Sequence, residues 1–257
     1  MKKKWSLILM AGLSALVLAA CGQKQAETKT PNTLTVGLEG TYAPYSYRQN
    51  GKLTGFEVDL AKETAKRMGL KPKFVTTGWD SLIAGLNSNN YDVIFNNMAE
   101  NPDRQKKFRF ATPYIYSKSI LITKKDGSIK SAKDLKGKKV AEGTGTDNFN
   151  NAKKLGATPV ASPDFQTSMD MIDQGRVVGA VNSREAFEYW KKSHQDTDLT
   201  YKEIPDSEIK TSAIAPMMNK KNAKLQAKMD KAIKSERKDG TLKRLSMKYF
   251  GTDITEK

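Results

Sequence analysis

The sequence contains one cysteine, Cys21, and one histidine, His194, among its 257 residues. A single thiol cannot form a disulfide within the chain, so the hydrophobic core alone must hold the fold together. One Cys and one His also cannot supply a His/Cys metal site. His194 lies in a polar, lysine-flanked stretch, where a Ser-His-Asp or Cys-His arrangement has little to build on. We therefore expect no metal, no cofactor and no catalytic residue.

Acidic residues are the minority among the charged ones. The chain has 44 Lys and Arg against 28 Asp and Glu, which gives a formal net charge of +16. Such a charge could suggest a nucleic-acid partner, but the lysines are scattered along the whole sequence, with no Arg-rich helix and no aromatic RNA-binding signature. A solvated basic surface facing an anionic membrane or cell wall is the favoured interpretation.

The N-terminus predicts where the protein works. Three lysines at 2–4 precede an apolar run, Trp5 to Leu18, that is too short to cross a bilayer comfortably. The run ends in Leu18-Ala19-Ala20-Cys21, which resembles the signal of a bacterial lipoprotein. The resemblance implies a signal peptide at 1–20, a lipidated Cys21 and a lipid anchor on the extracytoplasmic face of the cell membrane. The alternative is an ordinary signal peptide with an incidental cysteine.

Residues 21–32 follow as a polar segment that includes Pro31, and we interpret it as a flexible tether. The body that remains has about 225 residues, enough for one large domain or two lobes of about 100 residues each.

The body alternates apolar runs with helical patterns, which is typical of an α/β protein. Strands are expected at 34–38, 73–76, 93–95, 119–124, 139–141, 158–161, 177–181, 199–203 and 212–218. Helices are expected at 56–70, 81–86, 185–192, 222–238 and 241–250, with others after the glycine-rich turn and around 169–172. Asn101-Pro102 has the pattern of an N-cap and first helical residue, which places Arg104 in the first turn of a short helix. The pattern restarts after residue 124, so two similar lobes are expected.

Polar and aromatic groups follow several expected strands at the point where open α/β sheets bind ligands. They are Tyr42, the pair Asn96 and Asn97 with Arg104, Gly145 and Thr146 in "GTGTDNF", and Asn182-Ser183-Arg184, with Trp79 before the second helix. An arginine fork, hydroxyls and helix N-terminal amides are suited to a carboxylate, and aromatic faces suit the apolar body of a small ligand. By itself the glycine-rich stretch could equally be an ordinary turn, since it lacks the ending of a nucleotide P-loop.

Together these segments resemble the solute-binding proteins of the polar amino-acid family that serve ABC transporters. The matching stretches are "GTYAPYSY", "GFEVDLAKETAKRMG", "GWDSLIAGLNSNNYDVIFNNMAENPDRQKKFRFATPY", "DLKGKKVAEGTGT" and "DGTLKRLSMKYFG". The resemblance implies a bilobal, periplasmic-binding-protein-like α/β fold with two crossing strands and a ligand cleft. Lobe 1 would comprise 33–122 and 217–257, and lobe 2 would comprise 123–216. It also implies a monomer that binds an amino acid, delivers it to a membrane permease and performs no catalysis.

The resemblance assigns residues to the carboxylate end of the ligand. Arg104 matches the arginine that binds the α-carboxylate, and the Gly145 amide with the hydroxyl of Thr144 or Thr146 matches the second lobe's contribution. A surface salt bridge is the alternative role for Arg104.

At the amine end, Asn97 and the carbonyl of Ala99 match the strand-end acceptors. The family usually has an acid where this chain has Ser183, and burying an ammonium without a carboxylate is costly. Glu39 could supply the charge from the other lobe, neutral acceptors could hold the amine, or the amine could be modified or absent.

The pattern "FNNMAENPDRQKKFRFATPY" is most similar to the cystine-binding branch. Tyr42 and Trp79 match aromatic walls around the ligand side chain, although core packing is the alternative for both. With Asn96 and Asn97 they line a cleft with no evident acid, which argues against Arg or Lys as the ligand. The expected ligand is cystine or a similar polar amino acid.

Two other functions are possible on these features. Some proteins of this fold are extracytoplasmic dehydratases, and Glu39, Glu100 or Glu142 could then transfer a proton. The charge would also suit a wall-binding or adhesion lipoprotein.

Overall fold

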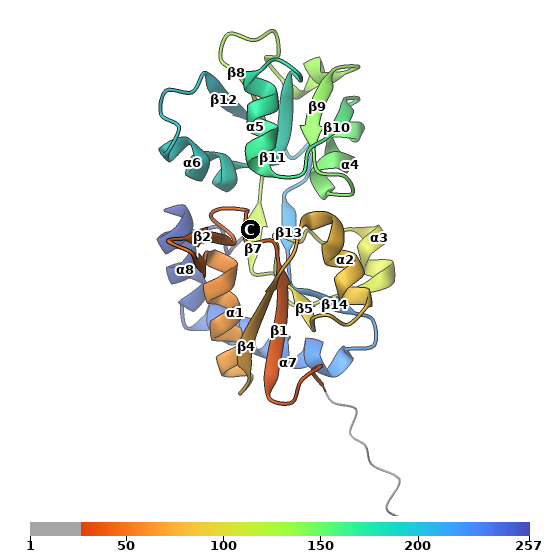
Figure 1. Ribbon diagram of the computed structural model, residues 1–257, viewed down its shortest axis with the longest axis vertical. Coiled ribbons are helices and arrows are strands. Elements are labelled where there is room, and N and C mark those ends of the chain that lie inside the picture. The colour runs from red at the N-terminus through yellow and green to blue at the C-terminus, as the bar shows by residue number, and fades with distance from the viewer. Residues whose placement is uncertain (1–26) are drawn as a thin grey trace, which may run out of the picture.

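Two five-stranded sheets form the centres of two lobes in the computed structural model, which describes residues 27–257 (Figure 1). The expected signal peptide and Cys21 lie outside the described residues. No helix within 27–257 combines the length and apolar character needed to cross a membrane.

The first sheet has the order β4-β1-β5-β14-β6. Its strands are β1 (Thr33–Leu38), β4 (Lys71–Thr76), β5 (Val93–Ile94), β6 (Phe108–Phe110) and β14 (Met217–Asn219). The helices of this lobe are α1 (Phe56–Arg67), α2 (Trp79–Asn87), α3 (Pro102–Lys107), α7 (Ala223–Lys238) and α8 (Thr241–Phe250). Since β1 pairs in parallel with both β4 and β5, the carboxyl ends of these strands meet at one edge of the sheet, which faces the other lobe.

The second sheet has the order β10-β9-β11-β8-β12. Its strands are β8 (Ser119–Lys124), β9 (Lys139–Glu142), β10 (Thr158–Ala161), β11 (Gly179–Ser183) and β12 (Leu199–Glu203). A 3₁₀ turn, η1 (Ala132–Leu135), and the helices α4 (Asp147–Lys154), α5 (Phe165–Asp173) and α6 (Arg184–Lys192) complete the lobe. The fold is the bilobal α/β architecture that the sequence predicted.

A two-stranded antiparallel ribbon connects the lobes. It consists of β7 (Ile115–Ser117) and β13 (Ser212–Ile214). The single strand expected at 212–218 is two strands, because Ala215 and the following proline, which has no N–H to donate, separate β13 from β14. The chain first crosses before β8, so residues 119–122, which we assigned to the first lobe, pair in the second sheet.

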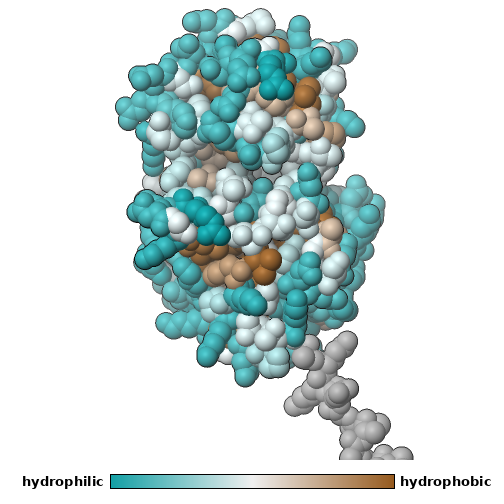
Figure 2. All heavy atoms as spheres, in the orientation of Figure 1, coloured by the Kyte–Doolittle hydropathy of each residue, from teal (hydrophilic) through white to brown (hydrophobic). Residues whose placement is uncertain are grey.

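Two short elements were not expected in the turn-rich stretch after β1. These are β2 (Tyr47–Gln49) and β3 (Lys52–Thr54), which form a hairpin. The end of the expected tether also contacts the body: the Lys29 amide donates to Asp92 Oδ1 at 2.5 Å, while Asp92 Oδ2 accepts from Thr35 at 2.8 Å. The face in Figure 2 is largely hydrophilic, with paler residues where the lobes meet.

Candidate functional site

A cavity lies between the lobes, at the carboxyl ends of β1 and β5 on one side and of β9 and β11 on the other. It is lined by most of the expected site residues: Glu39, Tyr42, Trp79, Asn96, Asn97, Ala99, Arg104, Thr146 and Ser183. Thr144 and Gly145 are not among the lining residues, although both contact the first lobe. Strand ends from distant parts of the sequence therefore meet in one cavity.

Arg104 forms a buried part of the cavity wall. The Asn101 side chain accepts from the Arg104 amide at 2.9 Å, which starts α3 at Pro102 and fixes the arginine in the first turn. Arg104 is 7% exposed, and its guanidinium carbon lies over the Trp79 ring, 5.6 Å from the ring centre. The guanidinium donates to the carbonyls of Ala99 at 3.0 Å and Gly145 at 3.2 Å. Burial lowers the pKa of Arg104, and within the described part of the chain it forms no salt bridge.

The glycine-rich turn contacts the first lobe through carbonyl oxygens. Thr144 O accepts from the Trp79 indole at 2.8 Å, and Gly145 O accepts from Arg104. Thr146 caps α4 by accepting from the Phe149 amide at 2.9 Å. We expected the Gly145 amide and a threonine hydroxyl to face a ligand carboxylate, whereas here the carbonyls of this turn meet the opposite lobe. The lobes are thus in direct contact, as in a closed arrangement.

Ser183, at the position where the resemblance implied an acid, bonds to the first lobe. Its hydroxyl lies 3.1 Å from the Tyr45 hydroxyl and 3.3 Å from that of Tyr42, and it caps α6 at the Ala186 amide, 3.4 Å away. Ser183 is 5% exposed. Because these partners occupy its oxygen, Ser183 is poorly placed to replace the missing acid.

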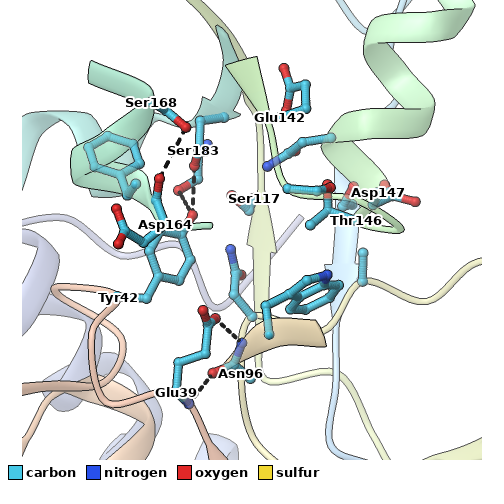
Figure 3. A pocket seen from close by; sticks show the side chains of 18 of the residues that line it. Glu39, Tyr42, Asn96, Ser117, Glu142, Thr146, Asp147, Asp164, Ser168 and Ser183 are labelled. Atoms are coloured by element: carbon cyan, nitrogen blue, oxygen red, sulfur yellow. Dashed lines mark hydrogen bonds between the residues drawn. The ribbon is translucent and has the colours of Figure 1, made fainter. Parts of the chain in front are cut away.

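Carboxylates nonetheless reach the cavity from both lobes. Glu39 and Asn96 bond to each other twice: Asn96 Nδ2 donates to Glu39 Oε2 at 2.6 Å, and the Glu39 amide donates to Asn96 Oδ1 at 2.8 Å (Figure 3). Burial raises the pKa of Glu39. Asp147 and Asp164 line other sides of the cavity, with Asp164 near Tyr42. The expectation of a cleft without an acid was wrong.

A further acid, Glu142, is only 2% exposed at the end of β9. It also lines the cavity and accepts from the Val181 amide at 2.7 Å, and burial raises its pKa well above the ordinary value. Glu100, the third acid considered for proton transfer, is not among the residues that line the cavity.

Several lining residues were missed from the sequence. They are Ser117, Lys118 and Ser119 at the crossing, and Asp147, Ser162, Asp164, Phe165 and Ser168 in the second lobe. Asp147 and Asp164 lie at the starts of helices that follow β9 and β10, so the strand-end rule that selected Asn96 could also have selected them. Lys118 follows β7, a three-residue strand too short to recognise by alternation.

Asn97 supplies an acceptor that no group within residues 27–257 uses. Its backbone has a φ of 45°, in the left-handed region that asparagine tolerates better than most residues. The side-chain Oδ1 is buried and has no hydrogen-bond partner in the described part of the chain. By contrast, the carbonyl of Ala99 already accepts from Arg104.

The sequence model of the bacterial extracellular solute-binding proteins, family 3, matches residues 34–252. The L-cystine-binding protein TcyA of Bacillus subtilis is 36% identical over 275 residues, which cover 99% of this chain and 100% of the relative.

Solved structures agree with this likeness. The unliganded, open L-cystine solute receptor of Neisseria gonorrhoeae is 35% identical with a TM-score of 0.61, covering 88% of this chain and 95% of the receptor. An ancestral arginine-binding protein bound to arginine is 30% identical but superimposes better, with a TM-score of 0.78 over 86% of this chain and 99% of that protein. The better fit to a ligand-bound structure agrees with the direct contacts between the lobes.

Proposed function

Because this chain belongs to the bacterial extracellular solute-binding proteins, family 3, we propose that its cleft captures a polar amino acid, L-cystine in the first place, for delivery to an ABC permease. The observation that carries the proposal is that two residues lining the cavity lack charged or hydrogen-bonding partners within residues 27–257. Arg104 is buried there without a carboxylate partner, and Asn97 Oδ1 has no hydrogen-bond donor. An α-carboxylate and an α-ammonium would satisfy one each.

The charges of the cavity support cystine in particular. Cystine carries two ammonium and two carboxylate groups, one pair at each end. Arg104 and Lys118 supply two cations, and the acids of the cavity supply acceptors in both lobes. The likeness to TcyA over almost the whole chain favours the same ligand.

A cationic amino acid such as arginine is the second candidate. Glu39, Asp147 and Asp164 outnumber the cations Arg104 and Lys118 among the lining residues, and an arginine side chain would balance them. An ancestral arginine-binding protein has a similar structure, and it matches this chain equally well when bound to arginine and when bound to glutamine.

The proposed action is binding followed by a hinge motion, without chemistry. The lobes would close on the amino acid about β7 and β13, and the closed form would present both lobes to the permease. A role for Arg104 in the carboxylate grip, and for Tyr42 and Trp79 as walls beside the ligand, forms part of the same proposal.

A thermal-shift screen of the twenty amino acids plus cystine tests the proposal. A ligand at 100 times its Kd stabilises the fold by about 2.7 kcal/mol, which corresponds to a rise in Tm of roughly 5–10 °C for a chain of this size. Isothermal titration with L-cystine, L-arginine and L-glutamine then ranks the ligands. A flat screen would contradict amino-acid capture, and turnover of a prephenate-like acid would favour a dehydratase.

We also propose that Cys21 is lipidated and anchors the protein to the outer face of the cell membrane. The sequence Leu18-Ala19-Ala20-Cys21 after an apolar run supports this proposal. Cys21→Ser should move the protein from the membrane fraction to the medium. Equal retention of both forms on the membrane would contradict lipid anchoring.

A further inference from the structure

Glu57 is a completely buried carboxyl group directly behind the cavity wall. It lies in the first turn of α1, is 0% exposed and is not among the lining residues. Its Oε1 accepts from the Asn97 backbone amide at 2.5 Å and from the Tyr114 hydroxyl. Its Oε2 is buried without a hydrogen-bond partner in the described part of the chain. The first lobe therefore buries an acid that accepts from the peptide of a lining residue and from the Tyr114 hydroxyl.

Asn97 depends on this contact for its shape. The residue has a φ of 45°, a conformation that costs a non-glycine residue free energy unless its surroundings hold it. The Glu57 carboxyl receives the Asn97 N–H, and the direction of the side chain, with its unpartnered Oδ1, follows from the backbone conformation.

We propose that Glu57 is a positioning residue for amino-acid binding: it fixes the Asn97 peptide so that Asn97 Oδ1 accepts from the ammonium of the bound amino acid. The inference rests on the proposed function, since it concerns the same cavity. Glu57 itself does not touch the amino acid and acts through the Asn97 backbone.

The charges around Glu57 link this role to protonation. The groups that face it are the Tyr114 hydroxyl, the Glu39 carboxyl at the end of β1 and the Tyr45 hydroxyl, and within the described chain it forms no salt bridge. Burial, together with the nearby Glu39 carboxyl, raises the pKa of Glu57 to about 7, against the lowering effect of the hydrogen bonds from Tyr114 and Asn97. An ammonium bound at Asn97 would bring a cation close to Glu57.

This arrangement decides whether ligand affinity rises or falls with pH. A nearby cation favours the ionised carboxylate and lowers its pKa, so Glu57 should release a proton when an ammonium binds. Affinity should then increase as pH rises from 6 to 7.5, because less work is needed to ionise Glu57 at higher pH. Glu39 could also release a proton, so the two acids must be separated by mutation.

The experiment is isothermal titration of the purified chain with L-cystine at pH 7, in phosphate and in Tris, whose ionisation enthalpies differ. The difference in apparent enthalpy between these buffers gives the number of protons released. L-Arginine replaces L-cystine if the wild type binds only arginine. Failure of both to bind the wild type counts against the proposed function, not against the role of Glu57.

We expect the wild type to release a substantial fraction of a proton and Glu57→Gln to release clearly less. Glu57→Gln should bind at least 10-fold more weakly at pH 7.5, with a flatter dependence of Kd on pH. The matched control is Glu236→Gln, since Glu236 is equally buried in the same lobe, has a pKa raised to about 7, and does not line the cavity. That variant should keep the wild-type affinity and proton release.

Two outcomes would overturn the inference. One is wild-type affinity and proton release in a folded Glu57→Gln variant. The other, which remains decisive if Glu57→Gln does not fold, is the absence of any proton release by the wild type between pH 6 and 7.5. If Glu57→Gln does not fold, proton release on ligand binding that persists in both Glu236→Gln and Glu39→Gln would support Glu57 as the source of the proton.

Discussion

The Tyr42 hydroxyl donates a 2.6 Å hydrogen bond to Asn182 Oδ1, and this bond joins the two lobes. Tyr42 follows the first strand of lobe 1, whereas Asn182 lies on β11 of lobe 2. The Tyr42 ring stacks on the Tyr45 ring, with 5.0 Å between the ring centres. It also packs against Phe165 of the second lobe, with 6.2 Å between the ring centres. The end of β11, where the resemblance implied an acid, thus contributes here to contact between the lobes.

Tyr45→Phe should weaken closure without altering the cavity lining. Tyr45 is 0% exposed, and its hydroxyl lies 3.1 Å from Ser183 Oγ and 3.3 Å from Glu185 Oε2, both in the second lobe. Loss of one such bond costs about 1 kcal/mol, so the equilibrium constant for closure should fall about 5-fold and the apparent affinity by up to the same factor. Titration calorimetry measures the affinity, and small-angle scattering of the ligand-free protein measures the closure.

Tyr91→Phe is the matched control for this effect. Tyr91 is buried, and its hydroxyl donates to the Leu82 carbonyl within lobe 1. The variant should lose stability but keep the wild-type scattering profile and affinity. Equal affinities for Tyr45→Phe and the wild type would show that the contact with Ser183 does not influence closure.

Arg104→Ala should largely abolish binding of the amino acid. The carboxylate would lose its charge-assisted partner at a cost of roughly 2–5 kcal/mol, which corresponds to a rise in Kd of about 30-fold to several thousand-fold. Arg104→Lys should recover only part of the loss, because an ammonium cannot donate bidentately. Calorimetry on all three forms checks the order, and near-normal affinity of Arg104→Ala would show that the arginine is structural.

The position of Arg104 could be predicted because local rules decide it. Asn101 and Pro102 specify the start of a helix, and a helix start after a buried strand points its first turn toward the edge of the sheet. The same reasoning extends to Asp147 and Asp164, which start helices after strands of lobe 2. These acids were not among the predicted site residues, although the same rule selects them.

The contacts between the lobes could not be predicted in the same way. Tyr45 and Glu185 are 140 residues apart, and nothing in their local sequence indicates that they meet. The bond between Glu57 and Asn97 is similar, since it depends on how α1 packs behind the end of β5. Short strands such as β7 were also missed, because three residues are too few to show alternation.

Gly85→Ala should destabilise the protein, contrary to helix propensity. Gly85 lies inside α2, where alanine is normally better than glycine by about 1 kcal/mol. A Cβ at this position would lie 2.5 Å from the Tyr91 hydroxyl oxygen, and one at Gly37 would lie equally close to the Tyr91 ring. We expect a net loss of about 1–3 kcal/mol in urea denaturation. The clash should disappear in a protein that already carries Tyr91→Leu, so Gly85→Ala should cost clearly less stability there than in the wild type. An equal cost of Gly85→Ala in both proteins would contradict this explanation.

The stability of the first lobe should fall as pH rises through 7, owing to Glu236. This acid on α7 is 0% exposed and accepts from the Thr64 hydroxyl at 3.0 Å. Arg67 Nε lies 3.6 Å away, but burial outweighs that attraction and raises the pKa of Glu236 from 4.5 to about 7. Below pH 4.5 the acid is protonated in both the folded and the unfolded chain, so its contribution to stability is complete there. As pH rises the unfolded chain ionises first, and the contribution is lost through pH 7.

Glu236→Gln should remove this dependence. The pKa of Glu236 is raised from 4.5 to about 7, and each pKa unit corresponds to about 1.4 kcal/mol. The stability of the wild type relative to the variant should therefore fall by roughly 3 kcal/mol between pH 4.5 and pH 8. Urea denaturation of both proteins at pH 5 and pH 8 measures the difference. Glu57 titrates in the same range but is present in both proteins, so its effect cancels in the comparison. A wild-type-to-variant difference that is the same at both pH values would show that Glu236 keeps one protonation state throughout.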